Sequence, residues 1–435
     1  MTFKGVKSKR LMKRFKKILF KEVNLKKKYS CIVCGPDTTY YRKCFEEDFL
    51  WVDNDQIIYN KKLLLKSIFT FFIIFFKFKF TYQNLRILIT LSFLIPIIKE
   101  LGKINIVCFF GYSLIGKSLK KILKKNITLI GFQHSMRDIR VDRKKELSNY
   151  DHYFQWNDFG NKKNINAKVV NFGSLKSYVV LEKYKKWKLI DKNFTKSKSL
   201  ILISSFGPIN ANLDKRYFTG LTNSQKIKRA EQLYEDFTKN RIELQYHDKQ
   251  ALEFFLLCSD LQKILSKLNL KLIILCRYQK STLNIKEKSI KGFNAEQKFY
   301  KSFFDDFVTI QDNFYIRLNK LFKYKKNSII LTNISSLGKE LLAMNFKVLF
   351  YGFVSNKVQK GYYDKKSIFC CLKKNQKTLL NYLEQIKTLS IDGLKKKKQM
   401  TKRGFLSFEP KKKKFEYFQI LTGLKLKKKM NLENI

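Results

Sequence analysis

The chain has few of the residues from which zinc sites are built. It contains only three histidines, and among its eight cysteines only Cys31 and Cys34 form a CxxC pair. A structural zinc site usually takes four soft ligands from two such pairs, so this composition argues against one. Most of the cysteines stand in apolar, strand-like segments, which predicts buried, reduced thiols in a cytoplasmic protein. We expect no metal site and no cofactor.

Apolar runs long enough to cross a bilayer are also lacking in the sequence. The most apolar region, 62–103, holds two runs, 67–76 and 87–98, separated by basic residues. Each run is shorter than the ~20 residues that a spanning helix needs. The N-terminus is basic but has no apolar core with a small-residue cleavage site, so no signal peptide is expected. Region 62–103 therefore predicts buried helices or a hairpin at a membrane surface.

Acidic residues are scarce. The chain has 35 Asp and Glu against 90 Lys and Arg, a net charge of +55, and only 13 of the basic residues are Arg. Such a charge attracts anionic lipid, nucleic acid or nucleotide substrates, and composition does not choose among them. A hydrophobic content of 45% over 435 residues is sufficient for two domains with apolar cores.

Strand-like and helix-like segments alternate along the chain, which predicts an α/β protein with largely parallel sheets. We expect a basic leader at 1–28, an α/β domain at 29–181 that contains region 62–103, a linker at 182–199, a second α/β domain at 200–390 and a Lys-rich tail at 391–435. The second domain is expected to contain a long insertion that includes 210–223. Leader and tail are predicted to hold the protein on an anionic membrane, the leader as an amphipathic helix that includes Leu19. Beyond Gly361 only helices are predicted.

Residues 327–352 form the clearest βαβ unit. An apolar run at 328–332 predicts a buried parallel strand, Leu337 opens a helical pattern, and 347–351 predicts the next strand. Ligands of open α/β sheets bind at the carboxyl ends of the strands, where a helix N-terminus favours phosphates. The Ser335–Ser336 turn is a candidate phosphate site, and the alternative is that it only caps the helix.

A second informative segment is ITLIGFQHSMRDIR at 127–140. Residues 127–132 predict a buried strand, and His134 stands at its carboxyl end. A neutral imidazole there can take a proton from an attacking hydroxyl. Arg137 and Arg140 offer fork-shaped donors to phosphate or carboxylate, and we assign Arg137 and Asp138 to a candidate acceptor or phosphate site. The alternative for His134 is a helix cap.

Other motifs support competing interpretations. GYSLIGKS at 111–118 fits the P-loop pattern of a nucleotide-binding kinase or NTPase, although no later strand ends in the Asp that would hold magnesium. Asp53-Asn54-Asp55 resembles an acidic metal site for nucleotide-sugars, and it is equally ordinary turn chemistry. The charge also permits a basic nucleic-acid-binding protein, but the aromatic residues interleaved with Lys lie in predicted core segments.

The order of five segments resembles the surface-carbohydrate and capsule-type glycosyltransferases and, more distantly, the CDP-glycerol glycerophosphotransferases. The segments are GFQHS at 131–135, YDHYFQWNDFGNKK at 150–163, VVNFGSLKSY at 169–178, LILISSFG at 200–207 and the βαβ unit. Both families are two-domain GT-B proteins of bacterial envelope polymer assembly. The resemblance covers roughly 104–352 and implies two Rossmann-like domains that face a cleft, with the acceptor on the N-terminal and the donor on the C-terminal domain.

The resemblance also implies roles for individual residues. His134 becomes the general base, and Glu340 lies near the sugar or ribose of the donor. This sequence departs from the pattern at Ser135, where the families have Gly, and at Asn333, where the glycerophosphotransferases have Asp. The candidate donor site comprises Asn333, Ser335, Ser336, Gly338, Glu340 and, as a second phosphate clamp, Arg277.

The expected protein is a metal-independent glycosyltransferase of bacterial surface polysaccharide biosynthesis. The resemblance implies that it transfers a sugar or sugar-phosphate unit from a nucleotide-activated donor to a glycan or lipid-linked acceptor. We expect it at the inner face of the plasma membrane as a peripheral protein, with no specific nucleic acid partner. A non-catalytic relative that binds glycan is a further alternative.

Overall fold

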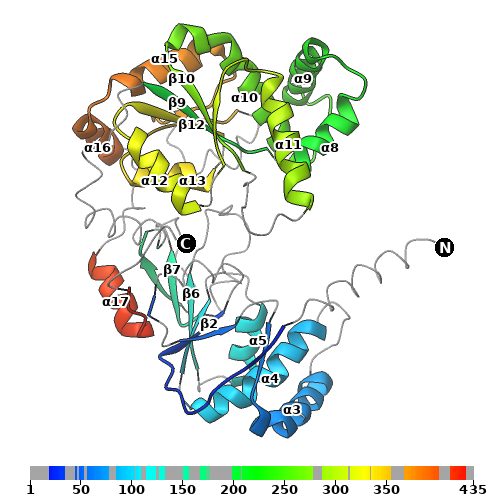
Figure 1. Cartoon of the computed structure of the whole chain (residues 1–435), viewed down its shortest axis with the longest axis vertical. Helices are drawn as coiled ribbons and strands as arrows, with labels where there is room; N and C mark the ends of the chain where they lie inside the picture. Colours follow the sequence, from blue (N-terminus) through cyan, green and yellow to red (C-terminus); the bar gives the residue numbers. More distant parts are fainter. Residues whose placement is uncertain are drawn as a thin grey trace, which may run out of the picture. The chain divides into compact units, whose positions relative to one another are not determined.

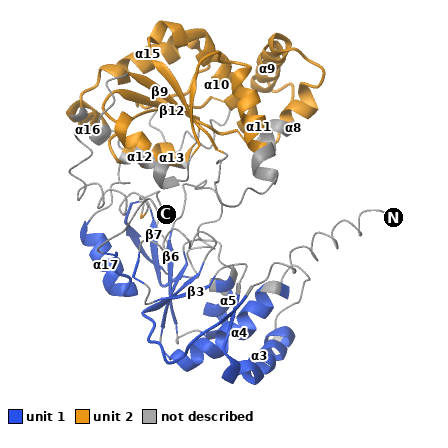
Figure 2. Ribbon diagram, in the orientation of Figure 1, with its two compact units in different colours: residues 1–174, 410–430 blue, residues 175–409, 431–435 orange. Residues whose placement is uncertain are grey.

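A computed structural model of the chain shows two compact units (Figure 1). Unit 1 comprises Met1–Ser174 and Pro410–Met430, and unit 2 comprises Leu175–Glu409 and Asn431–Ile435 (Figure 2). The structure describes residues 19–34, 45–46, 49–52, 56–77, 85–102, 104–108, 114–123, 127–132, 150–155, 167–173, 175, 198–206, 208–277, 287–311, 314–333, 335–353, 367–400 and 412–427.

Unit 2 is built on a six-stranded, wholly parallel sheet. Its strands are β9 (Ser199–Ile203), β10 (Lys271–Leu275), β11 (Val308–Ile310), β12 (Ser328–Thr332), β13 (Lys347–Tyr351) and β14 (Cys370–Cys371). The spatial order is β11-β10-β9-β12-β13-β14. Numbered along the chain, this order is 3-2-1-4-5-6, which is the order of a Rossmann fold.

Helices cover both faces of this sheet. They are α8 (Pro208–Tyr217), α9 (Asn223–Thr238), α10 (Tyr246–Leu268), α11 (Glu287–Lys301), α12 (Phe314–Tyr324), α13 (Ser336–Ala343), α15 (Gln376–Thr388) and α16 (Ile391–Met400). Because strand side chains alternate between faces, Leu200 and Leu202 join the core cluster with α10 and α15, whereas Thr332 and Phe350 contact α13.

Helix boundaries in unit 2 follow from local sequence signals. Thr222 caps α9 in a reciprocal capping box with Gln225, and the Asn375 side chain accepts a hydrogen bond from Thr378 N of α15 at 2.9 Å. α10 is followed by Asn269 in the left-handed region at φ 48°, a conformation that Asn adopts more readily than most residues.

Unit 1 contains a second six-stranded parallel sheet. Its strands are β2 (Cys31–Cys34), β3 (Leu50–Val52), β5 (Ile104–Cys108), β6 (Ile127–Phe132), β7 (His152–Gln155) and β8 (Lys168–Asn171). The order β3-β2-β5-β6-β7-β8 begins as the 2-1-3-4-5 order of flavodoxin-like folds and adds one strand. A separate parallel pair joins β1 (Leu19–Glu22) to β4 (Gln56–Tyr59).

The helices of unit 1 are α3 (Leu64–Lys77) after the short 3-10 helix η1 (Lys61–Leu63), α4 (Leu85–Leu101), α5 (Leu114–Leu123) and α17 (Lys412–Thr422). α4 and α5 share one core cluster with the sheet, and α3 packs on α4. Among the described residues, no helix has both the length and the hydropathy that crossing a bilayer requires.

The predicted α/β class with two Rossmann-like domains, as in a GT-B-like protein, is confirmed by these two parallel sheets. Strands predicted at 127–132, 328–332 and 347–351 have those bounds in the structure. The cleft that the resemblance implies stays a prediction. Seven cysteines lie in the described residues, and all seven are buried and free, as predicted.

Three predicted segments differ in the structure. Leu19 was assigned to a leader helix but opens β1, because β1 pairs in parallel with β4 and Val23 N donates to Tyr59 O at 2.7 Å. The insertion at 210–223 overlaps a helix, α8. After Gly361 only helices were predicted, yet Cys370 and Cys371 form β14, a strand too short to show a period in the sequence.

The predicted tail at 391–435 contains parts of both units. α16 belongs to unit 2, and its Leu394 is buried. α17 belongs to unit 1 (Figure 2), where the Phe418 ring lies 4.8 Å from Phe132 and 5.7 Å from Phe154 between centroids. Asn105 Nδ2 of β5 also donates to Leu421 O at 2.6 Å. The Lys-rich tail therefore contains a helix, α17, that packs on the unit 1 sheet.

A buried polar network fixes α10 against the unit 2 sheet. The Tyr351 hydroxyl donates to Asp260 Oδ2 at 2.7 Å, and Gln376 Nε2 donates to Asp260 Oδ1 at 3.2 Å. Asp260 and Tyr351 are both at most 1% exposed. Burial and the neighbouring Asp260 raise the pKa of Tyr351 above its ordinary value, so the phenol stays a donor.

Tyr351→Phe removes one donor from a buried carboxylate. We expect it to lower the free energy of unfolding of unit 2 by about 2 kcal/mol, the usual cost of losing a hydrogen bond to a charged group. Denaturant unfolding followed by circular dichroism measures this change. Tyr382→Phe on α15 is the control, because no hydrogen bond of its hydroxyl is found in the described part of the chain. Equal losses in both variants would contradict the role of the Asp260 network.

Candidate functional site

The strand order of unit 2 reverses direction between β9 and β12, and ligands of open α/β sheets bind at such a switch point. The carboxyl end of β9 continues into Ser204 and Ser205, and that of β12 continues into Asn333. Ser205 Oγ donates to Asn333 Oδ1 at 2.5 Å, so a hydrogen bond joins the two strand ends. Asn333 is buried, while Ser205 is partly exposed.

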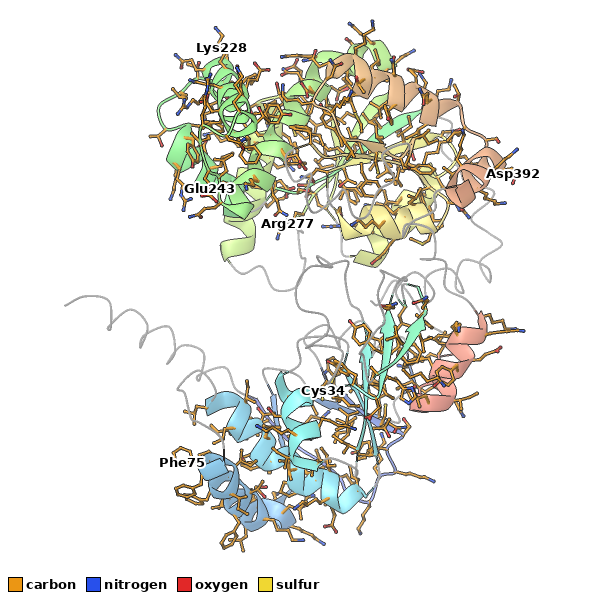
Figure 3. The ribbon with its side chains drawn as sticks, turned by 180° about the vertical axis from the view of Figure 1, so that it is seen from behind. Cys34, Phe75, Lys228, Glu243, Arg277 and Asp392 are labelled. Carbon is orange, nitrogen blue, oxygen red and sulfur yellow. The ribbon has the colours of Figure 1, made fainter. Side chains whose placement is uncertain are left out.

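A buried carboxylate joins β9 to β10 at the same edge. Glu296 of α11 is 0% exposed and accepts hydrogen bonds from the Ser204 hydroxyl and, at 2.9 Å, from Arg277 N. The Ser204 Oγ in turn accepts from Phe206 N at 3.2 Å. The backbone of Arg277 is therefore fixed, and its exposed side chain extends at this edge of unit 2 (Figure 3).

The N-terminus of α13 follows directly after β12. Ser335 is the N-cap, and its Oγ accepts a hydrogen bond from Leu337 N at 3.2 Å. Ser335 N donates to Thr332 Oγ1 at 3.3 Å, which ties the turn to the strand. The capping role considered for Ser335 is thus present. Because Ser335 Oγ is the acceptor in this bond, the hydroxyl can still donate its own proton.

Gly338 allows α13 to approach the sheet closely. A Cβ atom at this position would lie 2.7 Å from Thr332 Cγ2 and 3.2 Å from the Phe350 ring. Since Thr332 and Phe350 are fully buried, neither can move away cheaply. The structure therefore gives Gly338 a role in placing the helix N-terminus.

Two charged residues of α13 are buried beside this glycine. Lys339 and Glu340 are each 6% exposed. Burial lowers the pKa of Lys339 to about 8, and the neighbouring Cys370 opposes this shift. Glu340 is thus enclosed in the unit, and its predicted contact with a sugar or ribose stays a prediction.

Several predicted donor-site residues meet at the switch point. Asn333 is bonded to Ser205, Ser335 opens α13, and Arg277 is linked through Glu296 to the neighbouring Ser204. Ser336 begins α13, although its side chain is outside the described residues. Sequence reasoning missed Ser204, Ser205 and Glu296. A strand that ends in two serines was a usable signal for the first two, whereas nothing in the sequence distinguishes Glu296.

The acceptor-side residues lie outside the described residues. These are His134, Ser135, Arg137, Asp138 and Arg140, and the acidic turn Asp53-Asn54-Asp55 is also outside them. The strand that precedes His134 is described: β6 ends at Phe132 in the unit 1 sheet.

The P-loop alternative is not favoured by the local structure. A P-loop needs the residues between its two glycines free of helix, so that their N–H groups can cradle phosphates. Here α5 already begins at Leu114, Ile115 is buried in the core cluster, and Gly116 and Lys117 lie inside the helix.

No family model matches the chain, and no curated protein matches it. Among solved structures, the chain is similar to the wall teichoic acid polymerase TagF, with a TM-score of 0.46 and 11% identity over 92% of this chain and 90% of that chain. It is also similar to UDP-GlcNAc 2-epimerase from Methanocaldococcus jannaschii (TM-score 0.46, 12% identity, 93% and 100% covered). Sucrose-phosphate synthase from Thermosynechococcus elongatus is similar with a TM-score of 0.41 and 10% identity, over 79% of this chain and 81% of that chain. These low scores establish no family, donor or acceptor for this chain.

Lys339→Met tests the burial of the amine through its pH dependence. The pKa of Lys339 falls from 10.5 to about 8 on folding. The unfolded chain therefore binds this proton more tightly, and the resulting loss of stability is complete below about pH 8 and disappears as the pH rises to 10.5. We expect the variant to raise the free energy of unfolding by up to about 3 kcal/mol near pH 7, and the gain to shrink as the pH approaches 10.5.

Denaturant unfolding over this pH range, with Lys377→Met as the control, measures the effect. Lys377 is an exposed lysine on α15, so its replacement is expected to change little at any pH. A gain for Lys339→Met that does not depend on pH would contradict the buried, titrating amine.

Proposed function

We propose that the protein is a glycosyltransferase-like enzyme that transfers a sugar or sugar-phosphate unit from a nucleotide-activated donor. The observation that carries this proposal is the set of groups at the switch point of unit 2. The Ser205–Asn333 hydrogen bond, the capped N-terminus of α13 and the Arg277 side chain all belong to this edge of the sheet. The ordered segments that resemble GT-B envelope-polymer transferases support the same assignment.

The donor diphosphate is placed at the N-terminus of α13. Backbone N–H groups and the positive end of the helix dipole favour an anion there, and the Ser335 hydroxyl donates a further hydrogen bond. The Arg277 guanidinium supplies a fork of donors to the same diphosphate. Negative charge grows on the diphosphate as it leaves, so these groups stabilise the transition state more than the ground state. In this proposal they supply the charge that a metal ion supplies in other transferases.

His134 is proposed as the general base. It follows the carboxyl end of β6 by two residues. The resemblance to GT-B transferases assigns the acceptor to this N-terminal domain. The acceptor oxygen forms the new bond to the transferred unit while the bond between that unit and the nucleotide breaks. The nucleotide leaves with the bonding electrons, and the hydroxyl proton passes to the imidazole. The acceptor is a surface glycan or lipid-linked precursor, which would place the enzyme at the inner face of the membrane.

Donor binding is tested by thermal stabilisation with CDP-, UDP-, GDP- and CMP-linked donors, beside ATP and GTP. We expect a shift with one nucleotide-sugar that persists in EDTA. Arg277→Gln should weaken its Kd about 10-fold or more, because a charged hydrogen bond to phosphate is lost. Arg229→Gln, at a partly exposed arginine of α9 that donates to Gln232 on the same helix, is the matched control. A magnesium-dependent shift with ATP or GTP that is lost in Lys117→Ala would overturn the proposal in favour of the P-loop.

The role of His134 is tested once the donor is known. His134→Ala should lower the transfer rate by about 100-fold or more while donor affinity and the thermal midpoint stay unchanged. His247→Ala, in the first turn of α10, is the control and should retain full turnover. Unchanged transfer by His134→Ala would exclude it as the general base.

A further inference from the structure

One helix carries most of the exposed large apolar side chains of the described residues. On α3 the exposed fractions rise to 73% at Leu65 and 80% at Phe76. The exposed apolar residues of this helix are Leu64, Leu65, Ile68, Phe69, Phe72, Ile73 and Phe76. We call this set the α3 apolar face. Soluble proteins rarely expose so continuous an apolar surface unless it meets a partner or a membrane.

Helical geometry gathers these residues on one side. At about 100° per residue, their spacing of i, i+1, i+4, i+5, i+8, i+9 and i+12 covers a single broad stripe. Ser67 and Ile74 fall on the opposite side, where both are 3% exposed and α4 covers the helix. α3 is thus apolar on nearly every side, a pattern of helices that are enclosed by protein or by lipid. In unit 1 its packing partner is α4, on one side.

The two hydroxyl side chains of α3 add no unsatisfied polar group to the helix, because both donate hydrogen bonds to backbone carbonyl groups. The Ser67 hydroxyl donates to Leu63 O at 3.0 Å, and the Thr70 hydroxyl donates to Lys66 O at 2.7 Å. Both hydroxyls are satisfied by the backbone of the preceding turn, which is how hydroxyl residues are accommodated in helices that face lipid. The ring of Phe75, labelled in Figure 3, packs against two other rings of the same helix. Its centroid lies 6.0 Å from that of Phe71 and 5.5 Å from that of Phe76.

The length of α3 determines the kind of contact. Its 14 residues extend about 21 Å at 1.5 Å per residue, less than the ~30 Å hydrocarbon core of a bilayer. No helix of the described residues meets the requirements for spanning a membrane. A helix of this length with an apolar, aromatic face instead lies in the plane of the interface, between headgroups and acyl chains.

Lysines flank the α3 apolar face. Lys61 and Lys62 precede the helix and are exposed, and Lys66 is 68% exposed at the margin of the stripe. The ion pairs Lys61–Glu22 at 3.5 Å and Lys66–Glu100 at 3.7 Å are solvent-exposed and weak, so neither withdraws its lysine from an anionic surface. Anionic headgroups complement these lysines, because opposite charges attract at the membrane surface.

We propose that α3 docks unit 1 on an anionic lipid bilayer. The α3 apolar face enters the boundary between headgroups and acyl chains, while Lys61, Lys62 and Lys66 contact headgroup phosphates. This docking does not depend on the transfer reaction or on the switch-point site of unit 2. It names a surface of the folded unit as the membrane contact, in addition to the basic leader and tail.

The test is flotation of the full chain with vesicles of phosphatidylcholine alone or mixed equally with phosphatidylglycerol. The variant Phe72→Glu/Phe76→Glu should lower partitioning to mixed vesicles about 100-fold, because two phenyl groups no longer leave water and two charges repel the surface. Ile420→Glu is the matched control: Ile420 is 83% exposed on α17 of the same unit, away from the α3 apolar face. It should bind as the wild type does.

A second variant separates charge from apolar burial. Lys61→Gln/Lys62→Gln should lower partitioning to mixed vesicles about 5-fold per charge and leave the weaker binding to phosphatidylcholine unchanged. Circular dichroism and thermal midpoints of all variants should match the wild type, since every changed residue is exposed. Equal flotation of Phe72→Glu/Phe76→Glu and Ile420→Glu would overturn the proposal. So would a wild-type dimer that Phe72→Glu/Phe76→Glu dissociates without loss of flotation, which would assign the face to a second copy.

Discussion

The parallel pairing of β9 with both β10 and β12 is the constraint on which the candidate site depends. β9 is the first strand of this sheet along the chain, and β10 and β12 lie on its two sides. The connections that follow β9 and β12 therefore lead away from each other at the carboxyl ends of the strands. The groups at this opening are held by specific bonds. Ser205 binds Asn333 across it, and the Glu296 carboxylate ties the ends of β9 and β10 together. The fold therefore positions polar groups before any ligand arrives.

The sequence predicted the apolar strands of the two large sheets better than the short strands β1 and β14. Strands such as β6, β12 and β13 were placed with their observed bounds, because apolar, β-branched runs between turn residues are determined locally. β1 and β14 were missed because their strand conformation comes from pairing with β4 and β13, which no local pattern reports. Long-range packing, and not propensity, determines such short edge segments.

The candidate site was predictable to a similar degree. The turn after β12 identified Asn333 and Ser335, since a strand followed by polar residues and a helix has a recognisable pattern. Glu296 was beyond prediction: it is one acidic residue of a solvent-bordering helix, and its importance arises only where α11 meets the ends of two strands. The assignment of Gly338 to ligand binding stays a prediction; a Cβ atom at this position would lie 2.7 Å from Thr332 Cγ2, so the glycine lets α13 approach the sheet closely.

The return of the chain to unit 1 has a consequence for how the protein is made. Phe415 and Phe418 of α17 belong to the aromatic cluster on the unit 1 sheet, yet the ribosome adds them after every strand of unit 2. Domains usually fold in the order of their synthesis. Here the rings of Phe132, Phe154 and Phe172 lack their contacts with α17 while more than two hundred further residues, from β8 to α17, are translated. Unit 1 therefore begins to form before unit 2 is synthesised, but it gains the aromatic contacts of α17 only after every strand of unit 2 has been made.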